Sequence, residues 1–118
     1  MIESLLELGF IKVGRFMLSN ETLDFERVDV NYNPHNIVWV IATNIEVLYV
    51  GETNDDMNTV VKDLEYGNKH RATRDRIHSL IEEYATKCEV YLLIDITGNN
   101  LKQDLITKFL PVGNLNGK

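Results

Sequence analysis

Apolar and polar residues alternate over much of the first third of the chain, a period of two that is typical of strands with one buried face. Loosely alternating runs cover residues 10–15 and 23–30, and the turn-forming residues Ser19-Asn20-Glu21 lie between them. Before these runs, the apolar residues of segment 2–8 have helical spacing, and Gly9 follows them in the position of a C-terminal glycine. The pattern predicts a short helix and then an antiparallel hairpin.

The middle of the chain contains two apolar runs that are predicted to form a second hairpin. Residues 37–42 form a nearly continuous run, residues 46–50 form another, and the turn Thr43-Asn44 separates them. A loop at 31–36, rich in turn-forming residues, leads into the first run. Because continuous apolar runs are typical of strands with two buried faces, we expect this hairpin to lie at the centre of the sheet.

Helical spacing of apolar residues dominates the next segment. Asp56 is a candidate N-cap for a helix that begins near Met57 and ends at Gly67. A second helix is predicted to begin at Ala72 or Thr73.

The last third of the chain predicts one more strand and one more helix. The strand covers residues 89–96, and Gly98-Asn99-Asn100 forms a turn after it. Pro111 and Gly113 mark the end of the final helix, whose inward-facing residues are expected to be Leu101, Leu105, Ile106 and Phe109. The order of all these elements predicts an α+β fold in which helices pack on a mainly antiparallel sheet.

Composition narrows the classes of protein to which this chain could belong. Its 118 residues are enough for one domain, and its net charge of −6 disfavours tight, sequence-independent binding to DNA, because such binders present a basic face to phosphates. Cys88 is the single cysteine, and no spaced set of His and Cys predicts a zinc site. With an acidic first turn and no apolar run of membrane-spanning length, we expect a cytoplasmic protein without a membrane partner.

A set of short motifs occurs along the chain in a defined order. Leu8-Gly9-Phe10 comes first, Val38-Trp39 follows, and Tyr49-Val50-Gly51-Glu52-Thr53 begins ten positions after Trp39. The later members of the set are Gly67, Thr73, Ile77, Leu105-Ile106, Pro111 and Asn114. In these residues and their spacing the chain resembles the GIY-YIG nuclease family, in particular a bacterial and phage branch with an N-terminal strand before the nuclease core. The resemblance implies a single GIY-YIG-like domain over 1–118, with an N-terminal helix and hairpin in an extension at 1–36 and the core at 37–114.

The resemblance also implies where catalytic residues would lie. Such nucleases use tyrosines from both halves of the motif, an arginine on the next helix, and a glutamate on a late helix that holds one divalent metal ion. In this chain the first tyrosine position is Trp39, the arginine position is Val60 or Thr59, and the glutamate position is Lys102. Tyr49 alone is retained. An indole cannot accept a proton and a protonated lysine cannot ligate a cation, so the resemblance implies a catalytically degenerate member without a metal cofactor.

Basic and motif residues together predict ligand binding in place of cleavage. Residues 69–76 form the one basic stretch of an acidic chain, and Lys102 replaces a metal-binding glutamate with a group that could bind phosphate directly. We expect Lys102, Arg71 and Arg74 to converge on a nucleotide or phosphodiester ligand, with an aromatic ring available for base stacking. A phage anti-defence protein that sequesters a nucleotide immune signal is one such use. The full set of candidate ligand-binding residues is Trp39, Tyr49, Gly51, Thr53, Arg71, Arg74 and Lys102.

Two other functions are compatible with the same residues. The first is a metal-dependent, restriction-type endonuclease that acts on DNA, with Tyr49 as a catalytic residue and Mg²⁺ as cofactor. The second is an interaction domain without a small ligand, and assembly into a homo-oligomer is compatible with all three functions. Several candidates also have structural interpretations, because Tyr49 can be a core residue, Gly51 and Thr53 can shape the end of a strand, and the basic stretch can be a solvated helix start.

Overall fold

The computed structural model describes residues 1–115 of the chain. In chain order, its elements are α1 (Ile2–Glu7), β1 (Ile11–Ser19), β2 (Thr22–Arg27), β3 (His35–Ala42), β4 (Val47–Asp56), α2 (Met57–Tyr66), α3 (Ala72–Ala85), β5 (Val90–Asp95), α4 (Lys102–Phe109) and α5 (Val112–Leu115). All the predicted helices and strands are confirmed, and the short helix α5 is an addition. Every helix described in this range is too short or too polar to cross a membrane.

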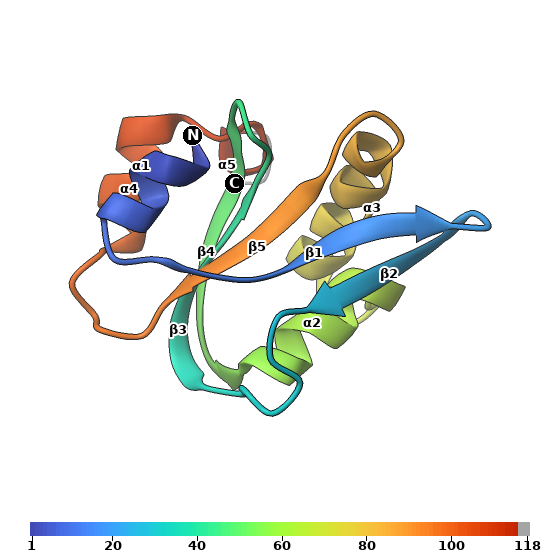
Figure 1. Ribbon diagram of the computed structural model, residues 1–118, viewed down its shortest axis with the longest axis horizontal. Coiled ribbons are helices and arrows are strands. Elements are labelled where there is room, and N and C mark those ends of the chain that lie inside the picture. The colour runs from blue at the N-terminus through green and yellow to red at the C-terminus, as the bar shows by residue number, and fades with distance from the viewer. Residues whose placement is uncertain (116–118) are drawn as a thin grey trace.

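The five strands form one sheet in the order β2-β1-β5-β3-β4, and every neighbouring pair is antiparallel. The predicted α+β class is therefore confirmed, and helices lie on both faces of the sheet (Figure 1). The prediction that the β3–β4 hairpin forms the centre is wrong, because β5 joins β1 to β3 and leaves β4 at an edge. A continuous apolar run indicates that both faces of a strand are covered, and it carries no information about how many neighbours the strand has.

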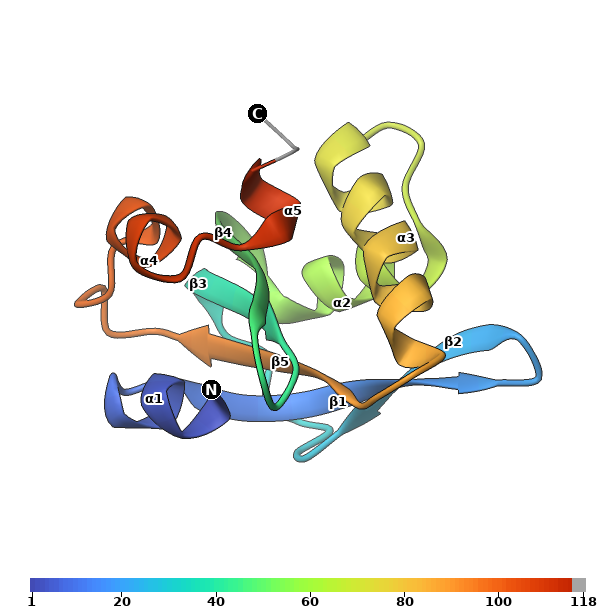
Figure 2. The same cartoon turned by 90° about the horizontal axis from the view of Figure 1, so that it is seen from above.

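Alternate residues of β3 point into two separate cores, one on each face of the sheet. Trp39 belongs to a buried cluster that contains the apolar residues of α2 and α3. Val38 belongs to a second cluster that contains Leu5 of α1 and Leu105 of α4. Figure 1 and Figure 2 agree with this division, since α2 and α3 lie on one side of the β3–β4 hairpin and α1 and α4 lie on the other. Neighbouring side chains of these strands therefore reach different helices.

Several local predictions are confirmed. A carboxylate oxygen of Asp56 accepts a hydrogen bond of 3.0 Å from the backbone N–H of Thr59, which caps α2. Hydrogen bonds, first from Thr59 and then from Asn33, lower the pKa of Asp56 to about 2. Asn20 and Glu21, with φ of 51° and 67°, form the two-residue turn between β1 and β2. Left-handed conformation at both central residues is what the twist of a tight hairpin favours.

The C-terminal region departs from expectation at two residues. Leu101 is 61% exposed and precedes α4 instead of facing the core. Gly113 lies within α5 instead of ending α4, which stops at Phe109. A Cβ at Gly113 would lie 2.6 Å from the carbonyl oxygen of Leu48, so this glycine is required for the close packing of α5 on β4.

Candidate functional site

Strand β4 places Tyr49 against Trp39, and both rings are buried. Their centroids are 5.0 Å apart, and the two residues are 6% and 3% exposed. Trp39 is paired with Gly51 across the β3–β4 ladder, and a Cβ at Gly51 would lie 2.6 Å from the indole ring. Packing therefore requires a glycine at this position, as the structural interpretation predicts. Neither ring has an open face, so the expected base stacking on them would require the rings to move.

Arg71 and Arg74, at the start of α3, form one network with the end of β4. Arg74 is 7% exposed, and its Nη1 donates a hydrogen bond of 2.8 Å to Asp63. Its Nη2 donates to the hydroxyl of Thr53 at 3.1 Å and to Asp55 at 3.2 Å. Arg71 donates to the same oxygen of Asp55 at 2.8 Å, and this hydrogen bond is the main cause of the lowered pKa of Asp55. The structure thus brings three of the predicted ligand-binding residues together.

The carboxylates of this network explain how two arginines are accommodated at a helix start. The positive end of a helix dipole disfavours cations there, and Arg71 is the N-cap residue of α3. Asp55 and Asp63 supply two negative charges in direct contact with the guanidinium groups. In this structure the anions bound by the arginines are therefore the protein's own carboxylates, and an added phosphate must compete with them.

Tyr49 has cationic neighbours that belong to α3. Burial raises the pKa of the Tyr49 phenol, whereas the charges of Arg76 and Arg74 act in the opposite direction. Arg76 is held in place by a hydrogen bond of 2.6 Å from its Nη1 to the carbonyl oxygen of Gly113. A phenol with a raised pKa is protonated at neutral pH, so Tyr49 can donate a hydrogen bond and is a poor base. The basic stretch that contains Arg76 is visible in the sequence, but its proximity to Tyr49 is apparent only in the structure.

Asn114 closes the outer edge of β4. Its side-chain oxygen accepts a hydrogen bond of 2.8 Å from the backbone N–H of Val50, and its side-chain nitrogen donates one of 2.9 Å to the carbonyl of Val50. These two bonds replace those that a further strand would make. Asn114 is one of the residues that carry the family resemblance, but its role in holding the motif strand is apparent only in three dimensions.

A cavity of about 390 Å³ lies beside the N-terminal end of β3, the C-terminal end of β4 and the loop before α4. Thr53 borders the cavity, but its hydroxyl accepts a hydrogen bond from Arg74 on the α2–α3 face of the sheet. Glu52, which is paired with Val38, lies on the α1–α4 face instead. Lys102 follows the cavity residue Leu101 and begins α4, which packs on the opposite face of the sheet from α3 and its two arginines. The expected convergence of three cations is therefore present for the two arginines and not for Lys102. The cavity walls include Asn36, Val38, Glu52, Thr53, Asn54 and Leu101.

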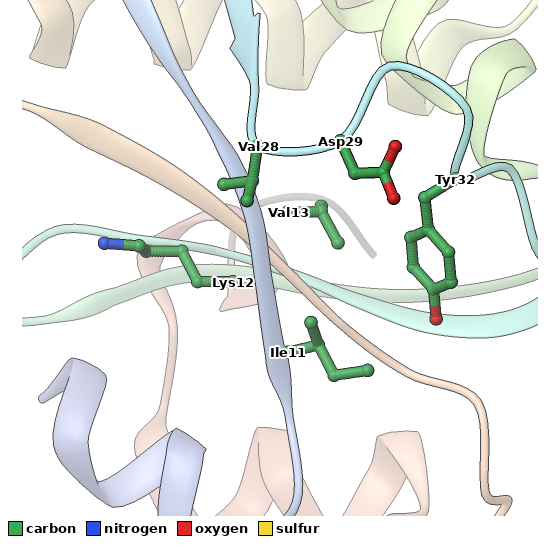
Figure 3. A pocket seen from close by; sticks show the side chains of 6 residues that line it. All are labelled: Ile11, Lys12, Val13, Val28, Asp29 and Tyr32. Atoms are coloured by element: carbon green, nitrogen blue, oxygen red, sulfur yellow. The ribbon is translucent and has the colours of Figure 1, made fainter.

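A second cavity, of about 250 Å³, lies beside β1 and is shown in Figure 3. Its walls combine apolar side chains with one lysine, one aspartate and one tyrosine, namely Ile11, Lys12, Val13, Val28, Asp29 and Tyr32. The aspartate balances the lysine, so this cavity has no excess of positive charge to attract a phosphate. The two arginines at the end of β4 are balanced by aspartates as well, but they offer planar sets of donors that this cavity lacks.

The architecture can now be compared with those of solved proteins. A structure of a mutant of bacteriophage T4 EndoII is similar to this one, with a TM-score of 0.70 over 95% of this chain and 96% of that chain and a sequence identity of 18%. The fold is GIY-YIG-like. No protein-family model matches the chain, and no curated protein matches it. At this level of identity the likeness establishes the fold and not the activity.

Within the GIY-YIG-like fold, the positions that the resemblance assigns to catalysis have structural contacts of their own. Val60 is fully buried, and Thr59 donates its backbone N–H to Asp56. A divalent metal ion does not fit at Lys102, because an ammonium group has no lone pair to offer and repels a cation. In the part of the chain that the structure describes, no group of three or more His, Cys, Asp or Glu residues is placed to hold a metal ion.

Proposed function

We propose that this chain binds a nucleotide or another phosphodiester ligand at the C-terminal end of β4 and does not cleave it. The observation that supports this most strongly is the buried guanidinium of Arg74, which Asp63 and Thr53 hold in a fixed orientation beside the end of β4. A guanidinium held in a fixed orientation is a preorganised partner for phosphate oxygens, because its planar set of donors matches their geometry.

The ion pairs of the network allow one anionic ligand to enter. Arg74 and Asp63 form the inner pair, in which both side chains are 9% exposed. Arg71 and Asp55 form the outer pair, in which the side chains are 45% and 35% exposed. Exposed pairs are weak, so a phosphate can displace Asp55 from Arg71 at small cost, and it must also replace the 3.2 Å contact of Asp55 with Arg74. Asp63 would then keep Arg74 in place while both arginines contact the ligand.

The chemistry of the motif residues supports binding without cleavage. Trp39 cannot take a proton from water, Tyr49 keeps its own proton at neutral pH, and Lys102 cannot ligate a metal ion. The net charge of −6 favours a small ligand over a DNA duplex, which would be repelled along its whole length. Sequestration of a nucleotide immune signal, as in phage anti-defence, is one use of such a site.

A metal-dependent endonuclease is the second candidate function, and the likeness in fold to T4 EndoII favours it. The arginines near Tyr49 are also compatible with it, since guanidinium groups can stabilise the negative charge that develops during phosphodiester cleavage. This candidate requires a metal site that does not depend on position 102.

Calorimetry with linear and cyclic mono- and dinucleotides, in the presence of EDTA, tests the proposal. We expect binding that persists without metal, weakens with salt, and falls at least about tenfold in Arg71→Ala, because a charge-assisted hydrogen bond is lost. Arg15→Ala is the matched control, since Arg15 contacts two carboxylates of its own on the β1–β2 side of the sheet. Failure of every nucleotide to bind would contradict the proposal. Mg²⁺-dependent nicking of plasmid DNA that disappears in Tyr49→Phe would establish the endonuclease instead.

A further inference from the structure

The 390 Å³ cavity on the α1–α4 face of the sheet is lined by polar groups that lack partners. Glu52 lies on this face because it is paired with Val38, and Asn54 lies two residues further along the same side of β4. Both side chains are exposed, and neither forms a hydrogen bond or ion pair with any residue of the described range. The described walls of the cavity include no Lys, Arg or His, so the carboxylate of Glu52 has no counter-charge there.

Asn100 adds a further acceptor to the cavity, and its neighbours fix the orientation of its amide. The side-chain nitrogen donates to the carbonyl oxygen of Leu8 at 2.8 Å and to the carboxylate of Asp95 at 3.1 Å. Because both partners are acceptors, the nitrogen must face them and the amide oxygen is left as an acceptor. Asp95 is 1% exposed and also accepts from the backbone N–H groups of Thr97 and Asn100, at 3.0 Å and 3.2 Å. The loop that carries this acceptor is therefore held in one geometry.

Apolar side chains line other parts of the same cavity. Val38 is 9% exposed, Leu101 is 61% exposed, and both border the cavity. Acceptors from separate elements, a single negative charge and an apolar wall together suit a cation that has several donors and an apolar stem. An arginine side chain has this chemistry, because its planar guanidinium carries only donors and its methylene stem packs on apolar surface. The ammonium of lysine is a compact, strongly hydrated charge and matches such a set of acceptors less well.

We infer that this cavity binds an arginine side chain of a different protein, at a site separate from the arginine network. The carboxylate of Glu52 accepts a parallel pair of hydrogen bonds from the guanidinium, the oxygen of Asn100 accepts another, and the stem packs on Leu101. The net charge of −6 favours the approach of a basic partner. Arg71 and Arg74 belong to α3 on the opposite face of the sheet, so a partner at this cavity leaves them free.

A simpler interpretation of Glu52 is a solvated surface carboxylate, as expected for many of the 18 acidic residues of this chain. The two interpretations differ in whether the loss of this one charge changes the affinity for arginine. Glu21→Gln is the matched control, because Glu21 is also exposed, lies at the tip of the β1–β2 hairpin, and changes the net charge by the same amount. Lys102 follows Leu101 without lining the cavity, so Lys102→Gln should not weaken the binding of a cation.

The test is an NMR titration of the isotope-labelled chain with short acetylated and amidated peptides whose central residue is arginine, lysine or citrulline. We expect the arginine peptide to shift the side-chain amide signals of Asn54 and Asn100 and to bind roughly fivefold more tightly than the lysine peptide. The citrulline peptide lacks the charge and should bind at least about tenfold more weakly than the arginine peptide. Glu52→Gln should weaken binding of the arginine peptide by about tenfold, and Glu21→Gln should not. An unchanged thermal midpoint would show that Glu52→Gln is folded.

The other outcomes would overturn the inference. Equal affinities of the arginine and citrulline peptides, or of the arginine and lysine peptides, would show that the cavity does not recognise a guanidinium. An affinity for arginine that survives Glu52→Gln would leave Glu52 as a solvated carboxylate. If Mg²⁺ shifts the same amide signals and abolishes peptide binding, the cavity holds a metal ion. Self-association of the wild type that Glu52→Gln abolishes would assign the site to a second copy of this chain. Nucleotide binding should be the same in wild type and Glu52→Gln, so this inference and the proposed function can fail separately.

Discussion

Two arginine–carboxylate clusters in this molecule use the same chemistry in different surroundings. Arg15 contacts Glu26 at 2.9 Å and also contacts Glu89, and these three side chains are 36%, 56% and 47% exposed. Arg74 contacts Asp63 at 2.8 Å, and both side chains are 9% exposed. Water and salt screen the first cluster, whereas loss of one partner in the second would leave a buried charge uncompensated. Because it is buried, the Arg74 cluster is better suited than the Arg15 cluster to keep a binding site in a fixed geometry.

The clusters also differ in what they connect. Arg15 links strands that are already joined by backbone hydrogen bonds, since β1 pairs with both β2 and β5. Arg74 links α3 to Asp63 of α2 and to Thr53 of β4, elements that have no ladder between them. The buried cluster therefore fixes the position of α3 relative to the motif strand. This is the geometry that a preorganised phosphate site requires.

The largest difference between the clusters should appear when each arginine is removed. Arg74→Ala should lower the free energy of unfolding by about 3–5 kcal/mol, because the buried Asp63 loses its 2.8 Å partner and keeps only the 4.0 Å contact with Arg71. Arg15→Ala should cause a much smaller loss, since its carboxylates remain hydrated. Urea denaturation of both variants at neutral pH measures the two values.

A double variant sharpens this prediction. Arg74→Ala combined with Asp63→Asn should recover part of the lost stability, because it removes the uncompensated charge as well as its partner. Equal losses in Arg74→Ala and Arg15→Ala would contradict the assignment of the buried cluster as the organising one.

A smaller loss of stability is expected when Thr53, the neutral partner of Arg74, loses its hydroxyl. Thr53→Val keeps the branched shape but removes the hydroxyl that accepts from Arg74 and from the backbone N–H of Asp55. The expected loss in unfolding free energy is about 1–2 kcal/mol, measured by urea denaturation. Thr107→Val is the control, because the exposed hydroxyl of Thr107 only donates to a carbonyl of its own helix. A change in Thr53→Val no larger than in the control would show that the hydroxyl does not support Arg74.

Local chemistry in the sequence predicted the elements well. The cap at Asp56 and the turn at Asn20-Glu21 depend only on residues a few positions apart, and both are confirmed. The position of β4 at an edge was missed, because strand order depends on β5, which follows β4 by more than thirty residues in the chain.

The candidate site was predictable only in part, for a similar reason. Arg71, Arg74 and Thr53 were named from the sequence, and the structure places them in one network. The carboxylates that neutralise the arginines were not predicted, because Asp63 and Arg74 meet only through the packing of α2 on α3. Lys102 was grouped with the arginines on the basis of the family pattern alone, and it begins α4, on the opposite face of the sheet from α3.

The smallest expected effect concerns pH, and it compares one carboxylate from each cluster. The hydrogen bond from Arg71 is the main cause that lowers the pKa of Asp55 from its ordinary value of 3.8. The hydrogen bond from Tyr91 is the main cause that lowers the pKa of Glu89 from 4.5. A carboxylate with a lowered folded-state pKa stabilises the fold fully above its unfolded-state pKa, and this stabilisation is lost as the pH falls through the folded-state pKa.

The difference in unfolding free energy between wild type and Asp55→Asn should therefore be constant near neutrality and shrink as the pH falls below about 3.8. For Glu89→Gln the difference should begin to shrink at a higher pH, near 4.5. Urea denaturation at a series of pH values from neutrality to roughly 3 measures both curves. Added salt should reduce the Glu89 difference more, because that side chain is 47% exposed and the side chain of Asp55 is 35% exposed. A difference for Asp55→Asn that does not change with pH would mean that Arg71 does not hold this carboxylate in solution, and the outer ion pair would then already be open to a phosphate.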